Sequence, residues 1–98
     1  MMILQNLRCG PMHGYALVQH IRRRSNDLLQ VEEGSLYPAL QRLLKAGSVR
    51  ARWSVSATGR RVRTYEITSK GARRLQREIT GFEQLLEGIR LVLAPIEP

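Results

Sequence analysis

Residues 33–47 have the sequence Glu33-Gly34-Ser35-Leu36-Tyr37-Pro38-Ala39-Leu40-Gln41-Arg42-Leu43-Leu44-Lys45-Ala46-Gly47, which predicts one short helix with a signal at each end. Ser35 is a favoured N-cap residue, and Gly47 lies where a left-handed residue ends a helix. Pro38 then falls in the first turn, where its missing N–H has no intrahelical partner anyway. At about 100° per residue, one side of the helix carries Leu36, Leu40 and Leu43. That side is expected to pack, and the opposite side is free to contact a partner or only water.

Composition limits the kind of partner. The 98 residues suit one small domain, and the formal net charge of +8 favours a polyanion such as nucleic acid or an anionic membrane. The alternative is a basic protein without such a partner. Because Cys9 is the only cysteine, we expect no intramolecular disulfide, no thiol-based metal cluster and a reducing compartment. No apolar run approaches the ~20 residues of a membrane span, so we expect a cytoplasmic protein without a membrane partner.

Two further helices are predicted before residue 33. The first ends at Gly10-Pro11 and carries a short apolar stripe, Met2, Ile3, Leu4 and Leu7. The second is expected from about Tyr15 to Arg24, with an inward face of Leu17, Val18 and Ile21. The segment after it has turn chemistry, and its apolar residues are expected to return to the core: Leu28, Leu29 and Val31. Two helices joined by a short turn describe a helix-turn-helix arrangement.

After Gly47 the apolar period changes from about 3.6 to 2, which is typical of a half-buried strand. Its inward side is expected to consist of Val49, Ala51, Trp53 and Val55. Thr58-Gly59 predicts a turn, and residues 61–68 predict the returning strand, with Tyr65 and Ile67 facing inward. The result is a hairpin with arginines at its tip.

Charge is segregated along the chain. From Arg50 to Arg77 there are nine basic residues and one acid, whereas four acids and one base follow from Glu78 onward. This asymmetry suits a polyanion-binding face better than a uniformly solvated surface does.

A long helix is predicted from about Ser69 to Leu93, with Pro95 behind it. A sustained heptad pattern runs along it: Ala72, Leu75, Ile79, Phe82, Leu86, Ile89 and Leu93. At 1.5 Å per residue such a helix is ~37 Å long, longer than a small domain covers with its own core. We therefore expect a two-fold homodimer interface, and the alternative is a helix folded back on its own domain. Residues 1–68 are assigned to DNA binding and residues 69–98 to dimerisation, within one continuous unit.

These elements together predict a mainly α fold with a small β-hairpin, a winged helix-turn-helix with a long C-terminal dimerisation helix. In that architecture the second helix of the pair enters the major groove and the hairpin, or wing, follows the duplex. The candidate DNA-binding residues on the helix are Ser35, Tyr37, Pro38, Gln41, Arg42 and Lys45. Those on the wing are Arg60, Arg61 and Arg63. The alternatives are a core-edge role for Tyr37 and a solvated turn for the wing arginines.

Several stretches resemble the PadR-like transcriptional regulators, especially the short subgroup with a single C-terminal helix. They are Gly10-Pro11-Met12-His13-Gly14-Tyr15, residues 29–43, Gly59-Arg60-Arg61 and Tyr65-Glu66-Ile67-Thr68. The most specific part is the run from Gly34 to Leu40. The resemblance covers nearly the whole chain.

That resemblance implies a bacterial repressor that binds an inverted-repeat operator in double-stranded DNA as a homodimer. It implies a dimer formed through the first helix, which includes Leu4, and the last helix. It also implies contact of Tyr37 with DNA, and a structural loop role is favoured for His13. The first helix begins abruptly compared with relatives. Phe82 stands where relatives often have tryptophan, so a ligand pocket between protomers has little support and any small-molecule effector is unknown.

Two other classes of function remain as alternatives. A basic RNA-binding or structural protein would use the hairpin on folded RNA, and it need be neither dimeric nor selective for a palindromic duplex. An enzyme is disfavoured because the sequence has no phosphate-binding glycine loop, no acidic pair in a plausible cleft and no metal-ligand spacing. No catalytic residue, metal or cofactor is therefore assigned.

Overall fold

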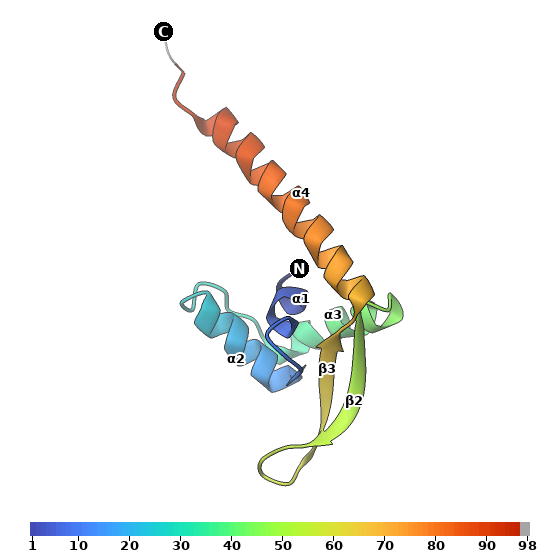
Figure 1. The fold of residues 1–98 in the computed structure, drawn as a ribbon. Coiled ribbons are helices and arrows are strands. Elements are labelled where there is room, and N and C mark those ends of the chain that lie inside the picture. Colours follow the sequence, from blue (N-terminus) through green and yellow to red (C-terminus); the bar gives the residue numbers. More distant parts are fainter. Residues whose placement is uncertain (97–98) are drawn as a thin grey trace.

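The computed structural model describes residues 1–96, and it has the winged helix-turn-helix architecture predicted from the sequence (Figure 1). Its elements in chain order are α1 (Met2–Leu7), β1 (Met12–His13), α2 (Gly14–Arg24), α3 (Glu33–Lys45), β2 (Val49–Val55), β3 (Arg61–Ile67) and α4 (Ser69–Leu93). The expected bounds of α2, β3 and α4 are confirmed to within one residue. No helix within the described residues is long and apolar enough to cross a membrane.

The start of α3 differs from the prediction. Its N-cap is Glu32, and no side-chain hydrogen bond caps the helix. Ser35 is therefore not the cap but the third helical residue, and Pro38 is inside the helix rather than in its first turn. Because proline has no N–H, the turn around Gly34 lacks one backbone bond of the ordinary helical pattern. The N-cap therefore lies three residues earlier in the sequence than Ser35, the position that cap chemistry alone predicts.

The end of α3 confirms the role predicted for Gly47. Its φ of +74° is left-handed, and the amide of Ser48 donates to the carbonyl of Leu43 over 2.9 Å. The amide of Gly47 donates to the carbonyl of Leu44 over 3.1 Å. This pair of bonds is the Schellman motif, which satisfies carbonyls that a helix end leaves free.

The sheet has three strands rather than the two of the predicted hairpin. Its order is β1-β3-β2 and both pairings are antiparallel. The added strand β1 pairs Met12 with Tyr65 and His13 with Thr64. His13 also caps α2, since its Nδ1 accepts from the amide of Ala16 over 3.3 Å. This is a structural role of the kind favoured from the sequence.

The core lies where α1, α2, α3, the base of the sheet and the first turns of α4 meet. Its members include Leu4, Leu17, Leu40, Tyr65 and Leu75. Two expectations about the core are wrong. Leu28 and Leu29 are 85% and 43% exposed, because the connection before α3 turns through Asn26 and Asp27, both at positive φ, and keeps to the surface. The outer half of β2 is also exposed, since the hairpin extends beyond the core there, and both Trp53 and Val55 are solvent-facing.

A tight joint fixes the start of α4 to the end of α3. Thr68 Oγ1 donates to the carbonyl of Gly47 over 2.6 Å and accepts from the amide of Gly71 over 3.1 Å. The amide of Thr68 also donates to the carbonyl of Ser48 over 3.1 Å. At Gly71, an added Cβ would lie 2.0 Å from that same Ser48 oxygen. Only glycine fits this approach, so one threonine and one glycine set the direction in which α4 leaves the domain.

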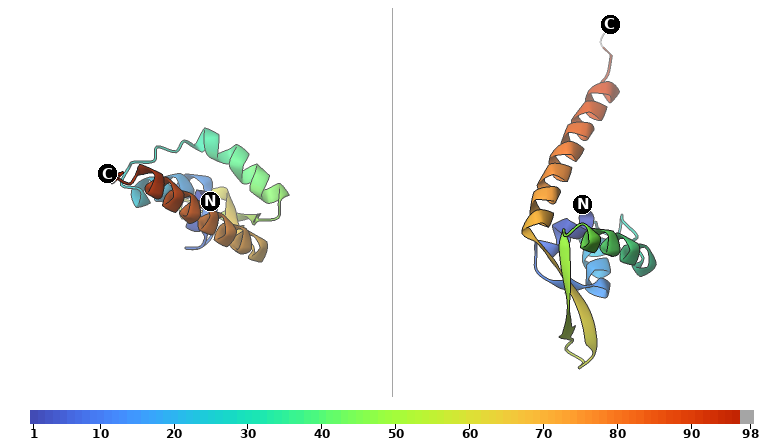
Figure 2. Two further views of the ribbon diagram at one scale, coloured as in Figure 1. Left: turned by 90° about the horizontal axis from the view of Figure 1, so that it is seen from above. Right: turned by 90° about the vertical axis from the view of Figure 1, so that its right-hand side faces the viewer.

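The rest of α4 projects from the domain as a single helix (Figures 1 and 2). The molecule measures 66 × 29 × 21 Å along its principal axes. The first turns are anchored through Leu75 in the core and through Glu78. That carboxylate lies 2.8 Å from Arg74 Nε and 3.1 Å from the α-amino group of Met1. The hydrogen bond from Arg74 is the main cause that lowers the pKa of Glu78. From Gly81 to Ile96 every residue is exposed.

Candidate nucleic-acid interface

The outer face of α3 is free, as the sequence pattern predicted. Leu36, Leu40 and Leu43 are buried. The six candidate DNA-binding residues on this helix are all exposed: Ser35, Tyr37, Pro38, Gln41, Arg42 and Lys45. The amphipathic division of the helix is thus confirmed, and the DNA contacts themselves stay a prediction.

Tyr37 is both packed and accessible. An added Cβ at Gly14 would lie 3.0 Å from the Tyr37 hydroxyl oxygen, so this phenol lies directly over the first residue of α2. The side chain is nevertheless 44% exposed. A core-edge role and a DNA-binding role for Tyr37 are therefore compatible, because packing against α2 fixes a ring whose surface still faces solvent.

A groove of about 300 Å³ separates α3 from the wing. Tyr37 lines it from α3, Arg63 lines it from β3, and Tyr15 lines it from α2. Sequence patterns did not assign Tyr15 to the site. It could have been found as an aromatic residue at the start of a helix whose inward face is filled by other side chains. In the structure Tyr15 is 60% exposed. The groove brings α3 and one wing arginine to the same part of the surface.

The two faces of the wing differ in charge. On one face, Arg50 Nε lies 2.9 Å from Glu66 Oε1, and Arg52 Nη2 lies 4.0 Å from Glu66 Oε2. The predicted arginines Arg60, Arg61 and Arg63 are exposed and have no carboxylate partner among residues 1–96. Positive charge is therefore most available toward the wing tip, where Gly59 at φ +81° makes the turn.

The predicted dimerisation residues divide into two groups. Leu4 and Leu75 are 0% and 1% exposed in the chain's own core, which corrects their assignment, because they have no surface to offer a partner. Ile79 packs against the edge of that core. The remaining four are exposed: Phe82, Leu86, Ile89 and Leu93.

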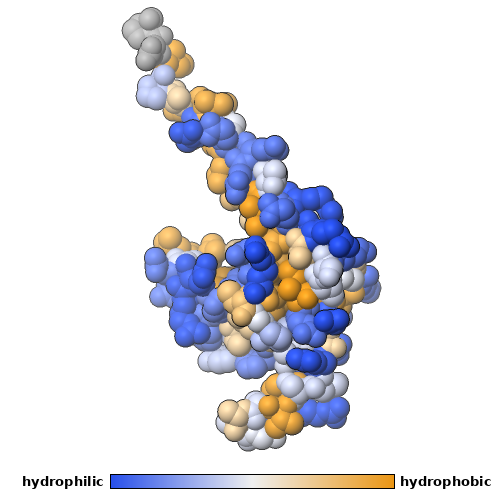
Figure 3. Space-filling model, in the orientation of Figure 1, coloured by the Kyte–Doolittle hydropathy of each residue, from blue (hydrophilic) through white to orange (hydrophobic). Residues whose placement is uncertain are grey.

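Two exposed residues extend this apolar stripe of α4, namely Leu85 and Val92. The prediction omitted them because they flank the strict heptad positions at helical spacing. Figure 3 shows hydrophobic surface along the projecting helix. We call Phe82, Leu85, Leu86, Ile89, Val92 and Leu93 the α4 stripe.

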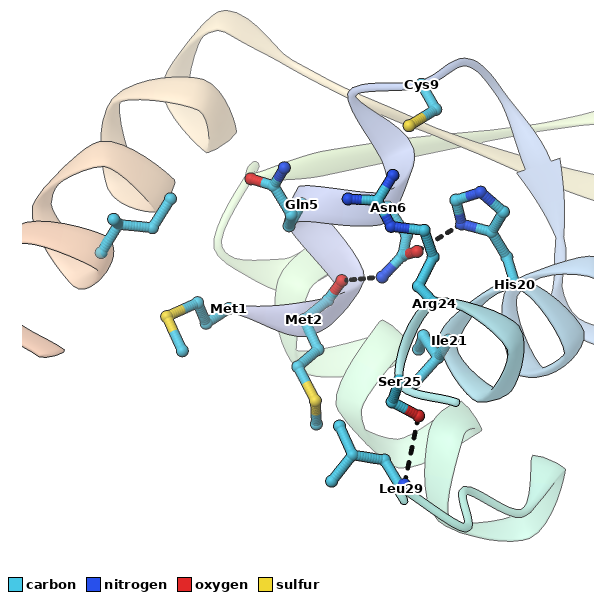
Figure 4. Close-up of a pocket in the computed structure, with 11 residues that line it drawn as sticks. Met1, Met2, Gln5, Asn6, Cys9, His20, Ile21, Arg24, Ser25 and Leu29 are labelled. Atoms are coloured by element: carbon cyan, nitrogen blue, oxygen red, sulfur yellow. Dashed lines mark hydrogen bonds between the residues drawn. The ribbon is translucent and has the colours of Figure 1, made fainter. Parts of the chain in front are cut away.

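A hollow of about 320 Å³ lies between α1, α2 and the start of α4 (Figure 4). Its apolar lining includes Met1, Met2, Leu29 and Ile79. Asn6 crosses its floor, where Nδ2 donates to the carbonyl of Met2 over 2.6 Å and Oδ1 faces His20 Nδ1. Residues 1–96 contain no cluster of three side chains that could hold a metal ion.

Comparisons with known proteins agree with this architecture. The model of the transcriptional regulator PadR-like family matches residues 3–77. A Lysinibacillus sphaericus protein described as uncharacterized protein X is 31% identical over 85 residues, which span 87% of this chain and 78% of that protein. The structure of a transcriptional regulator from Clostridium thermocellum, Cth-833, has a TM-score of 0.86 and 26% identity over 95% of this chain and 90% of that one.

One similar structure contains nucleic acid. Bacillus subtilis PadR, solved in complex with operator DNA, has a TM-score of 0.70 and 23% identity over 80% of this chain and 44% of that one. At this identity the similarity concerns the fold alone. The family model, in contrast, covers most of the present sequence, and the chain therefore belongs to the PadR-like family of transcriptional regulators.

Proposed function

We propose that this protein is a repressor that binds an inverted-repeat operator as a homodimer, with α3 in the major groove and the wing along the minor groove. The observation that carries the proposal is the groove shared by Tyr37 of α3 and Arg63 of the wing. Helix-turn-helix proteins place such a helix against base edges, while arginines contact phosphates or enter a narrow minor groove. The Bacillus subtilis relative that was solved with operator DNA supports the choice of duplex.

The surface area of the chain supports a dimer. A compact monomer of 11.2 kDa exposes about 5,700 Å², whereas this chain exposes 7286 Å². The excess is comparable to the surface that one subunit contributes to a substantial interface. The α4 stripe contributes to this area, since its six residues are 45–83% exposed.

The proposed occupant of the α4 stripe is the same region of a second copy. Ile79 belongs both to the heptad pattern of α4 and to the hollow beside α1, so the stripe continues into the apolar lining formed by Met1 and Met2. A two-fold pairing buries both surfaces at once. In this proposal residues 1–68 bind DNA, and residues 69–98 supply the dimerisation helix of the same continuous unit.

Replacing Tyr37 with phenylalanine is expected to weaken operator binding about fivefold, since one hydrogen bond contributes roughly 1 kcal/mol. The ring still packs over Gly14, so the urea midpoint of unfolding should not change. Fluorescence anisotropy with a labelled operator measures the affinity. Unchanged affinity would show that the hydroxyl makes no contact with DNA.

Replacing both Arg60 and Arg61 with alanine is expected to weaken binding to every duplex similarly. The slope of log K against log salt should become shallower by about 0.9 for each phosphate that the protein no longer neutralises. The matched control is Arg50→Ala with Arg52→Ala, which removes the same charge from the face that carries Glu66. Equal changes in slope for the two pairs would contradict the assignment of the wing tip.

The proposal as a whole is tested by selecting genomic DNA fragments with the purified protein and sequencing them. An inverted repeat should emerge, and sedimentation of the protein with the selected duplex should give two chains for each duplex. Enrichment without two-fold symmetry would contradict the dimeric mode. Preference for folded RNA over duplex DNA would favour the alternative of an RNA-binding protein.

A further inference from the structure

We propose that Trp53 is a positioning residue of the wing, which holds the guanidinium groups of Arg61 and Arg63 ready for the phosphates of a DNA strand. This inference rests on the proposed DNA-binding function and assigns it a further residue. The prediction from sequence had placed Trp53 toward the core.

The register of the wing brings the three side chains together. Trp53 of β2 is the direct partner of Arg63 on β3, and Val55 is the partner of Arg61. Direct partners, and residues two apart on a strand, share one face of a sheet. The Cζ atom of Arg61 lies 4.8 Å from the centroid of the Trp53 ring, and that of Arg63 lies 6.0 Å from it. Both distances are within the range of a cation–π contact.

Core packing does not account for this tryptophan. The indole is 57% exposed, and it lies on the part of β2 that extends beyond the core. At the base of the same face, Val49 and Tyr65 are 2% and 3% exposed. Both arginines lie over the Trp53 ring.

An aromatic partner suits an arginine that must later bind phosphate. On the opposite face Glu66 holds Arg50 and Arg52, and a carboxylate of this kind competes with phosphate for the same guanidinium. The indole ring restricts the arginine without neutralising it. Arg63 also lines the groove that contains Tyr37, so one of the held cations borders the recognition helix.

The expected benefit is pre-organisation. A free arginine loses much rotamer freedom when it binds, whereas a stacked arginine has lost part of it already. Removing the ring should therefore weaken DNA binding about two- to fivefold for each arginine that the indole no longer holds.

The experiment compares Trp53→Leu in two backgrounds, the natural chain and Arg61→Ala. Leucine keeps an apolar side chain and removes the ring. Anisotropy with a fluorescein-labelled duplex of mixed sequence gives the affinities. In the natural chain the ring is lost to two arginines, so we expect affinity to fall about four- to twenty-five-fold. Once Arg61 is absent only Arg63 is affected, and we expect a smaller loss of about two- to fivefold.

A second measurement tests the stack in the free protein. Trp53 is the only tryptophan, so its fluorescence reports on the wing alone. Arg61→Ala should make the indole more accessible to acrylamide quenching, while the neighbouring change Arg60→Ala should not. Equal quenching of both variants would overturn the proposed stack.

The binding outcomes are equally decisive. An equal loss of affinity from Trp53→Leu in both backgrounds would mean that the ring itself contacts DNA, and no loss would mean that it does not assist binding. Either result would overturn the positioning role. A natural chain that binds no duplex in this assay would contradict the proposed function instead, and the quenching comparison would still test the stack.

Discussion

Replacing Ile89 with lysine is expected to convert the protein to a monomer and to abolish operator binding. Ile89 is 45% exposed near the middle of the α4 stripe, and a two-fold interface formed by this stripe would bury one new lysine from each copy. Burying such uncompensated charge costs about 4 kcal/mol, which is roughly a thousandfold in the dimer dissociation constant. Operator binding should be lost as well, because a monomer contacts only one half-site and binds it weakly.

Sedimentation measures the oligomeric state, and circular dichroism checks that the helices remain. Leu86→Lys should behave in the same way. The matched control is Leu91→Lys, since Leu91 is 66% exposed but lies about 200° around the helix from Ile89. A dimer that survives Ile89→Lys, or that Leu91→Lys dissociates equally well, would exclude the α4 stripe as the interface.

Replacing Gly71 with alanine is expected to destabilise the protein by about 2 kcal/mol or more, the range found for overpacked sites. The added Cβ would meet the carbonyl oxygen of Ser48 at 2.0 Å and Ile67 Cγ1 at 3.0 Å. Backbone cannot rotate away as a flexible side chain can, so the first turn of α4 must shift. For a domain of this size the change lowers Tm by about 10 °C, which differential scanning calorimetry detects.

Gly81→Ala is the control for that substitution. It lies in the same helix with no heavy atom within 4 Å of an added Cβ, and alanine favours a helix interior over glycine by about 1 kcal/mol. The two changes should therefore shift Tm in opposite directions. If Gly71→Ala is also stabilising, the close approach at Ser48 is not rigid.

Sequence patterns predicted the long elements of this fold well. The heptad pattern identified α4, whose predicted bounds agree with those of the structure, and alternation along the hairpin identified Tyr65 as an inward residue. They failed where a short local signal competed with tertiary contacts. Ser35 has the chemistry of a cap, yet α3 starts earlier, and β1 is a two-residue strand that exists only because β3 lies beside it. No periodicity is detectable over two residues.

The candidate site was only partly predictable for a related reason. The spacing of the leucines in α3 shows which side of the helix is buried, so the residues on its exposed side could be predicted. The alternation along β2 correctly places Trp53 and Val55 on the same face as Val49. It does not show that the core ends before these two residues, which are therefore exposed. The positions of Tyr15 in the groove and of the Trp53 indole beside two arginines depend on which strands and helices lie next to one another. Those neighbours are set by the packed chain and not by local spacing.

The hydrogen bonds of Thr68 couple the orientation of α4 to that of α3. One hydroxyl group is bonded at once to the end of the second helix of the pair and to the first turn of the last helix, so the two cannot pivot independently. A helix of 25 residues amplifies small rotations, and a swing of about 5° at its base displaces its far tip by roughly 3 Å. In the proposed homodimer, a change in how the two α4 tips pack together would therefore change the distance between the two copies of α3.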